Sequence, residues 1–442
     1  MKIEVEVVST ETIKPSTPTP NHLRHYQLSY LDQISPPVFM PLVFFYPLND
    51  TNNTNMDLIN HHLKKSLSET LTRFYPLAGQ VMNNLYVDCN DTGIPYVEAR
   101  ATCRLSEVVR DPNPNELNKL IPYELDDIRD LPMVIQVTMF TCGGIAISIG
   151  ISHKVADAFS FFMFVNSWAA IASANYDDIP SPRFESAELF PPRNLIGYEP
   201  TTGMVKENIV TKRLVFTASK IADLRDKYTN ATSKENPTRP TRFEALSVFI
   251  WSRFMASTRA KTGGHADKTS TMIIHHTVNL RMRFDPPLPE NYFGNIYWHA
   301  IAIPAMDSSS TEDECCGLVN LMRDSVRNID VDYVTQLREN DKHLNFIKER
   351  AERFKRGEVV SFNFTSLCRF PTYEADFGWG KPVWVCSASL TFKNLVCFVD
   401  TRLGDGIEAW VNLKEEEMLK FEADQELLAM VSTALDDNTS GF

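Results

Sequence analysis

One histidine in this chain stands where a general base could act. Residues 145–151 form an apolar run that predicts a buried strand, and His153 follows directly after it. A second apolar run at 159–172 predicts a helix. An imidazole titrates near neutral pH, and the positive end of a helix would keep it unprotonated. The pattern indicates that His153 removes a proton from a substrate, with a buried core histidine bonded to backbone groups as the alternative.

Asp157 lies four positions after His153 and allows two interpretations. The carboxylate could orient the imidazole as in a catalytic dyad, or it could anchor the loop through an ion pair. A carboxylate in so apolar a neighbourhood must be paired. Arg281 and Arg283 are the candidate partners, because they follow the strand predicted over 271–279.

The sequence Asp-Phe-Gly-Trp-Gly at 376–380 is the second dense motif. Protein kinases share Asp-Phe-Gly, but this chain has neither their His-Arg-Asp loop nor their Gly-x-Gly-x-x-Gly loop. The motif predicts a tight turn, in which Gly378 and Gly380 supply positive φ and Asp376 caps backbone N–H groups. The indole N–H of Trp379 could in addition reach a substrate.

The composition argues against several classes of protein. The 442 residues carry a net charge of −12, which does not suit a nucleic-acid partner. The chain has no run of 18 apolar residues and no apolar signal core near its start, so we expect a cytoplasmic protein without a membrane partner. The eight cysteines form no Cys-x-x-Cys pair, and adjacent residues of a strand such as His275 and His276 point to opposite faces. We therefore expect reduced thiols and no metal site.

The chain reads as two halves of mixed α and β structure. Its length favours two domains, which we place at 1–180 and 207–442. Residues 181–206 are rich in proline without periodicity, and they predict a crossover connection between the domains. Further strands are predicted at 38–46, 133–140, 212–216 and 383–413, and helices at 57–73, 219–227, 241–255, 312–352 and 415–435.

Together the two motifs resemble those of the plant BAHD acyltransferases, which are coenzyme-A-dependent enzymes that move acyl groups onto alcohols or amines. The likeness covers nearly the whole chain and is greatest to the branch that contains vinorine synthase and related alkaloid acetyltransferases. Two positions depart from the family pattern, because Ala158 stands where many members have glycine and Gln80 where arginine is common. The other similar segments are 28–33 (Leu-Ser-Tyr-Leu-Asp-Gln), 74–79 (Phe-Tyr-Pro-Leu-Ala-Gly), 87–93 (Val-Asp-Cys-Asn-Asp-Thr-Gly) and 278–281 (Val-Asn-Leu-Arg).

The resemblance implies a fold and a set of roles. The fold would consist of two chloramphenicol-acetyltransferase-like domains with a solvent channel between them, in a monomeric protein. His153 would be the base in that channel, and Asp157 would turn away from it and pair with Arg281. The motif at 376–380 would be chiefly structural, with Trp379 as our candidate donor to the thioester oxyanion.

The resemblance also implies a reaction without a permanently bound cofactor. Acyl-CoA, most simply acetyl-CoA, would be the co-substrate, and the acceptor would be a hydroxyl of a plant specialised metabolite, an alkaloid in the branch named above. Both substrates would react within one ternary complex. The alternatives are an amine acceptor, a longer or aromatic acyl group, and a catalytically silent protein that keeps the channel. A condensation-domain-like enzyme is disfavoured, because Ser152 stands where those enzymes double the histidine.

Coenzyme A phosphates need an anion site, and a helix N-terminus provides one. We assign this role to Thr241 and Arg242, which open the helix predicted over 241–255. The alternative is an ordinary capped helix on the surface, since Thr-Arg-Phe-Glu is also a capping sequence.

Overall fold

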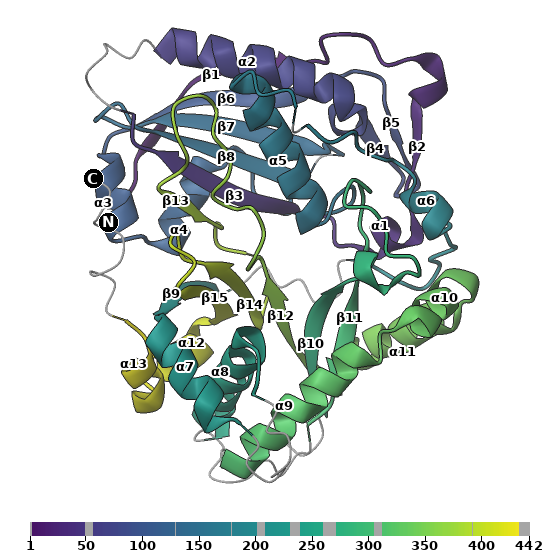
Figure 1. The fold of residues 1–442 in the computed structure, drawn as a ribbon, viewed down its shortest axis with the longest axis vertical. Helices are drawn as coiled ribbons and strands as arrows, with labels where there is room; N and C mark the ends of the chain where they lie inside the picture. The colour runs from purple at the N-terminus through teal and green to yellow at the C-terminus, as the bar shows by residue number, and fades with distance from the viewer. Residues whose placement is uncertain are drawn as a thin grey trace.

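The computed structural model describes residues 2–48, 56–128, 130–177, 179–200, 208–229, 239–259, 271–304, 312–390 and 392–432. These ranges form two six-stranded sheets, of which the first lies in the upper half of Figure 1 and the second in the lower half. This arrangement agrees with the mixed α/β fold expected from the sequence. Among the described residues, no helix has the length and apolar character that crossing a membrane requires.

The first sheet holds the strand that leads to His153. This strand, β8 (Ile145–Ser152), is buried along its whole length because it lies between two neighbouring strands while α2 and α5 cover one face of the sheet (Figure 1). Its nearly continuous apolar run reflects burial on both faces, because Ile145 and Ile147 belong to the core on one face and Ala146 to the core on the other. The strands of this sheet are, in spatial order, β1 (Val5–Ile13), β6 (Ile94–Ala101), β7 (Met133–Met139), β8, β3 (Phe39–Tyr46) and β13 (Trp384–Cys386), and the covering helices are α2 (Met56–Arg73) and α5 (Ala158–Ala172).

The second sheet carries its own core, formed with the helices packed against it. In spatial order its strands are β11 (Tyr297–Ala302), β10 (Thr271–Asn279), β12 (Val359–Ser366), β14 (Leu395–Asp400), β15 (Ile407–Lys414) and β9 (Ile209–Phe216). Its helices are α7 (Ala218–Lys227), α8 (Arg242–Arg259), α9 (Glu312–Arg327), α10 (Val331–Glu339), α11 (Lys342–Lys355), α12 (Glu415–Phe421) and α13 (Gln425–Met430).

The remaining short elements lie around the junction of the two halves and at the edge of the first sheet. They are a three-stranded sheet of β2 (His25–Gln27), β5 (Tyr86–Asp88) and β4 (Gln80–Met82), the helices α1 (Tyr30–Ile34), α3 (Leu105–Arg110), α4 (Pro114–Leu117) and α6 (Ser186–Leu189), and the 3-10 helices η1 (Asn21–Leu23), η2 (Tyr75–Ala78), η3 (Asn118–Leu120) and η4 (Arg281–Arg283).

One strand of the second half belongs to the first sheet. β13 pairs antiparallel with β3, so that Trp384 lies opposite Phe45 with the two rings stacked at 5.1 Å. The division into 1–180 and 207–442 therefore does not describe the packing of this segment. The physical reason is that β3 would otherwise leave an unpaired edge, which the short apolar strand covers.

Two predicted helices are divided in the structure. The helical run at 312–352 is three helices, and the second of them begins where the Asp330 side chain accepts a hydrogen bond from Tyr333 N. The run at 415–435 is two short helices, because Asp424 caps a new helix, and its last residues lie outside the described ranges. In both cases a capping aspartate inside a periodic pattern starts a new helix.

Candidate active site

His153 lies immediately after the end of β8, close to residues of the second sheet. Its backbone N–H donates to Val38 O at 2.8 Å, which holds this residue in register with β3. Its ring is partly exposed and lies 5.4 Å from the ring of Tyr297, which comes from β11 of the second sheet. The imidazole therefore stands at the junction of the two halves.

Asn295, in the loop between β10 and β11, fixes the tautomer of His153. Its Nδ2 group donates to His153 O at 2.7 Å and to Asp32 Oδ1 at 2.8 Å, so the orientation of the amide is determined. The remaining amide oxygen, Oδ1, lies 3.0 Å from His153 Nδ1. Because an amide oxygen can only accept, Nδ1 carries the proton and Nε2 keeps its lone pair.

Asp32 stands behind Asn295 and joins three segments of the chain. Its carboxylate accepts from Asn295 N at 2.9 Å, from Ser29 N at 2.8 Å and from Ser186 Oγ at 3.3 Å. Burial raises the pKa of Asp32, and these hydrogen bonds oppose that rise. The carboxylate thereby ties α1 and the crossover segment to the loop that positions His153.

Burial favours the neutral form of His153. Burial lowers the pKa of His153 below its ordinary value, and the charge of Asp157 and the hydrogen bond to Asn295 only partly oppose this. A neutral imidazole with a free Nε2 has the protonation state of a general base.

Asp157 anchors the loop and makes no hydrogen bond to His153 in the structure. It forms a two-pronged ion pair with Arg281, with Nη1–Oδ2 at 2.7 Å and Nη2–Oδ1 at 3.2 Å. The same carboxylate accepts from Ser160 N at 2.9 Å, which caps α5, and from Ile296 N at 3.1 Å. Burial alone would raise the pKa of Asp157, but Arg281 and these hydrogen bonds lower it overall. The arrangement is that of the loop anchor rather than that of a dyad.

Comparisons with known proteins identify the family of this chain. A family model described as the Transferase family matches residues 3–428. Stemmadenine O-acetyltransferase from Catharanthus roseus is 37% identical over 96% of this chain and 97% of its own length. Limonoid 7-O-acetyltransferase from Citrus sinensis is 38% identical over 97% of this chain and 98% of its own length. The crystal structure of vinorine synthase, an enzyme of Rauvolfia serpentina, matches with a TM-score of 0.82 at 34% identity and covers 98% of this chain and 99% of that one.

The chain belongs to the BAHD acyltransferases. It is an acyl-CoA-dependent acyltransferase. In this family acyl-CoA is a co-substrate, and among the described residues no group of three or more histidines, cysteines, aspartates or glutamates could hold a metal ion.

In this BAHD acyltransferase the motif at 376–380 forms the tight turn that its glycines predict. Asp376 Oδ1 accepts from Gly378 N and from Gly380 N, both at 2.8 Å. Gly378 has φ +102° and Gly380 has φ +104°, a region that side-chain-bearing residues rarely adopt. Asp376 therefore acts on the backbone of its own turn.

Trp379 lies far from His153, which corrects its assignment as the oxyanion donor. Its ring lies 6.2 Å from that of Tyr46, and Tyr46 pairs with Ile145 at the opposite end of β8 from Ser152. The two ends of β8 are seven residue-to-residue steps apart, or about 24 Å at about 3.4 Å per step. Trp379 Nε1 is buried without a hydrogen-bond partner at that far end. The motif sequence could not show this distance, because strand register sets it.

Thr241 and Arg242 lie where the sequence places them, at the start of α8. Thr241 Oγ1 accepts from Glu244 N at 3.1 Å, and Glu244 Oε2 accepts from Thr241 N at 2.8 Å, which completes a capping box. Arg242 pairs with Asp400 at 3.1 Å. An incoming phosphate would have to displace these contacts, so coenzyme A binding here stays a prediction.

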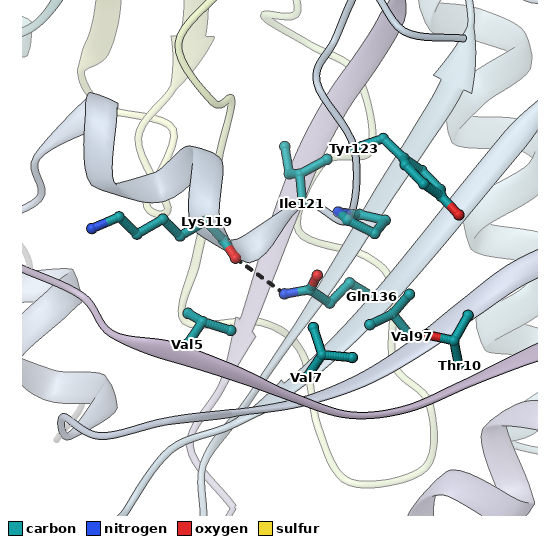
Figure 2. Close-up of a pocket in the computed structure, with 9 residues that line it drawn as sticks. Val5, Val7, Thr10, Val97, Lys119, Ile121, Tyr123 and Gln136 are labelled. Atoms are coloured by element: carbon teal, nitrogen blue, oxygen red, sulfur yellow. Dashed lines mark hydrogen bonds between the residues drawn. The ribbon is translucent and has the colours of Figure 1, made fainter. Parts of the chain in front are cut away.

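A cavity of about 360 Å³ opens at the edge of the first sheet, and its lining does not include His153 (Figure 2). Its floor is Gln136 of β7, whose side chain donates to Lys119 O at 3.2 Å, and its wall includes Val5 and Val7 of β1. None of its lining residues contacts His153, Asn295 or Asp157 in the structure, so it is not part of this site.

Asn295, Asp32 and Tyr297 were not predicted as site residues from the sequence. Asp32 lies within one of the segments that resemble the family, and Asn295 follows Gly294, whose φ is +121°. A glycine that needs positive φ next to a polar residue in a loop is a signal of a constrained site. No local signal connects Tyr297 with His153, because they meet only when the two halves pack together.

Proposed function

We propose that this BAHD acyltransferase transfers an acetyl group from acetyl-CoA to a hydroxyl of a polycyclic plant specialised metabolite. His153 is the general base, and both substrates react in one ternary complex. The observation that carries the proposal is the 3.0 Å hydrogen bond between His153 Nδ1 and Asn295 Oδ1, which leaves the lone pair on Nε2, in an imidazole whose pKa is lowered by burial. The names of the relatives, which act on stemmadenine and on limonoids, support acetyl as the donor group and an alkaloid or a limonoid-like alcohol as the acceptor.

The proton and the acyl group move in opposite directions. His153 Nε2 takes the hydroxyl proton as the acceptor oxygen attacks the thioester carbonyl carbon. The tetrahedral intermediate collapses with cleavage of the C–S bond, and the imidazolium gives the proton taken from the acceptor hydroxyl to the departing thiolate. Asn295 Oδ1 accepts from Nδ1–H throughout, and the nearby negative charge of Asp157 stabilises the transient imidazolium.

This assignment requires no acyl-enzyme, so the kinetics should be sequential rather than ping-pong. Holding the two substrates in line supplies about 7–11 kcal/mol of the barrier. The base contributes about 10²- to 10⁴-fold to the rate. Alignment of the two substrates therefore contributes more to the rate than the base does, and the residues that orient the imidazole add to this alignment.

The first test replaces the base. His153→Ala should lower kcat about 10²- to 10⁴-fold and leave the thermal unfolding temperature nearly unchanged. His61→Ala, on the exposed side of α2, is the matched control and should keep full activity. Near-normal turnover by the His153 variant would overturn the mechanism. Alcohol and amine analogues of one scaffold, assayed in parallel, separate O-acylation from N-acylation.

The second measurement needs no knowledge of the acceptor. Thermal unfolding is followed with free coenzyme A and with its acetyl, malonyl, tigloyl and benzoyl thioesters. A ligand at 100 times its Kd stabilises the native state by about 2.7 kcal/mol. The largest shift should occur with acetyl-CoA. No shift with any thioester would favour the catalytically silent alternative.

A further inference from the structure

The cavity at the edge of the first sheet lies between two layers of the chain. The edge strand β1 forms one wall, and residues 119–123, at and after η3, form the other (Figure 2). Tyr96 of β6 faces α2, where its hydroxyl donates to Asn60, and the next residue, Val97, lines the cavity. Because successive residues of a strand point to opposite faces, the cavity opens on the face of the sheet opposite α2.

A register shift in β1 brings two of its side chains into this cavity. Val7 lies opposite Ala99 and Thr10 lies opposite Val97, with the shift between Val7 and Ser9. The extra residue lets Val7 and Thr10, three positions apart, line the same space. The shift also interrupts the outer edge of β1, which disfavours the addition of a peptide strand along it.

The walls of the cavity are mainly apolar. Val97 and Ile121 are buried in them, whereas Val7 at the mouth is 59% exposed. Lys119 is the only charged residue of the lining, and its ammonium group donates to Glu116 Oε2 at 2.6 Å. Figure 2 shows the Lys119 side chain directed away from the other lining residues. A lining of this kind favours a neutral ligand.

Gln136 is the polar group of the cavity floor, and it is only 2% exposed. Its Nε2 donates to Lys119 O at 3.2 Å and to Thr138 Oγ1 at 3.0 Å. Because a backbone carbonyl only accepts, the nitrogen must face Lys119, and the orientation of the amide is determined. Gln136 Oε1 accepts no hydrogen bond from the described residues, yet it is not sealed inside the protein, so it opens into the cavity (Figure 2). A nearly buried acceptor is costly to leave unpaired.

The cavity is separate from the catalytic histidine. Gln136 pairs with Ser148 of β8, and His153 follows Ser148 by five residue-to-residue steps. In an extended chain five steps span about 17 Å at about 3.4 Å per step. A small ligand in contact with Gln136 therefore does not reach His153, and its binding does not depend on the proposed function.

We propose that this cavity binds a neutral ligand of about two fused rings that carries one hydroxyl group. The hydroxyl donates to Gln136 Oε1, and the rings lie between Val7 and Val97 of the sheet and Ile121 of the other wall. A cavity of about 150 Å³ holds benzene. The volume of about 360 Å³ measured here therefore leaves room for a second ring.

The test compares 2-naphthol with its methyl ether, 2-methoxynaphthalene, which keeps both rings and loses the donor. Their Kd values are measured by ligand-observed NMR titration. The wild type should bind 2-naphthol about 5- to 30-fold more tightly than the ether, because only the naphthol can pair with Gln136 Oε1. Gln136→Leu should bind both compounds equally, with its affinity for the ether unchanged.

Two tryptophan substitutions locate the bound compound. Val7→Trp fills the mouth of the cavity and should abolish binding of both compounds, and the exposed position should tolerate the larger side chain. Leu58→Trp, at a 66% exposed position of α2 on the opposite face of the sheet, is the matched control and should bind as the wild type does. This pair decides the location even if Gln136→Leu does not fold.

The outcomes separate this site from the catalytic one. Equal affinity of the wild type for naphthol and ether, or no binding of either, overturns the proposal, because water alone then serves Gln136 Oε1. A preference for naphthol that persists in Gln136→Leu, or binding that persists in Val7→Trp, also overturns it and places the compound elsewhere, such as near His153. Acetyl-CoA should stabilise the three variants as much as the wild type, and its failure to stabilise the wild type would count against the proposed function instead.

Discussion

At the scale of single residues, the reactivity of His153 depends on which nitrogen holds the proton. Asn295 determines this, because its amide group is oriented by Asp32 and by the carbonyl of His153 itself. The base, its orienting amide and the supporting carboxylate come from residues 153, 295 and 32, in three separate parts of the chain. A tautomer fixed in this way leaves Nε2 ready to accept a proton without rearrangement.

The pH dependence of catalysis should report this arrangement. Because burial lowers the pKa of His153 below its ordinary value of about 6.5, kcat/KM should stay constant at neutral pH and fall only at lower pH. The hydrogen bond to Asn295 favours the protonated ring, so Asn295→Ala should move this acid limb to still lower pH and reduce kcat about two- to tenfold. The measurement is a pH–rate profile at saturating acetyl-CoA.

Lys154 is the titrating neighbour that must be separated from His153. Burial lowers the pKa of its ammonium group to about 7, and Nζ donates to Gln33 O at 2.8 Å. Lys154→Met should leave the acid limb below pH 6.5 in place. If the acid limb of the pH–rate profile shifts in Lys154→Met and does not shift in Asn295→Ala, the titrating group is Lys154.

At the scale of elements, the loop between β8 and α5 is held from both ends. Asp157 caps α5 through Ser160 N and binds Arg281, which follows β10 of the other sheet. The ion pair is nearly inaccessible, with side-chain exposures of 2% and 7%. In such a pair the loss of one partner leaves a buried charge without compensation.

Asp157→Ala and Arg281→Ala should each reduce the free energy of unfolding by about 3–5 kcal/mol and lower activity with it. Glu374→Ala is the control, because its pair with Lys381 is more than half exposed and should contribute about 0–1 kcal/mol. Since the pKa of Asp157 is lowered in the native state, the stabilisation should persist above about pH 4 and disappear as pH falls through the lowered pKa. Denaturant unfolding at pH 7 measures the difference. Full stability with lost activity would instead support a catalytic dyad.

The elements near His153 show what a sequence can predict. β8, α5 and β10 follow from local apolar patterns, and β10 has the predicted bounds 271–279. The turn at 376–380 was also predicted, because its hydrogen bonds lie within the motif itself. The contact between Asn295 and His153 and the distance of Trp379 depend on register and on packing between sheets, which the pattern of one segment does not contain. The position of the arginines in the sequence left Arg281 and Arg283 as possible partners of Asp157. The resemblance to the family selected Arg281.

At the scale of the whole molecule, single buried residues contact both sheets and link them. Trp384 of β13 stacks on Phe45 in the first sheet, and its Nε1 donates to Glu408 Oε1 of β15 in the second sheet at 3.2 Å. Glu408 is itself buried and paired with Arg213 at 2.6 Å. Together with the contacts of Asp157 and Asn295, these interactions couple the halves on both sides of the junction.

This coupling predicts that the chain unfolds in one cooperative transition. Calorimetry should give a single peak whose van't Hoff and calorimetric enthalpies agree, and Trp384→Phe should lower its midpoint because buried Glu408 loses a donor, at a cost of about 1–3 kcal/mol. Trp379→Phe is the matched control, since its Nε1 has no partner to lose, and it should also keep full activity because the indole lies far from His153. Two separate peaks, with the Trp384 variant shifting only one, would mean that the halves fold independently. The active site would then have to assemble after folding, because His153 and Asn295 belong to different halves and acquire their geometry only when the two sheets meet.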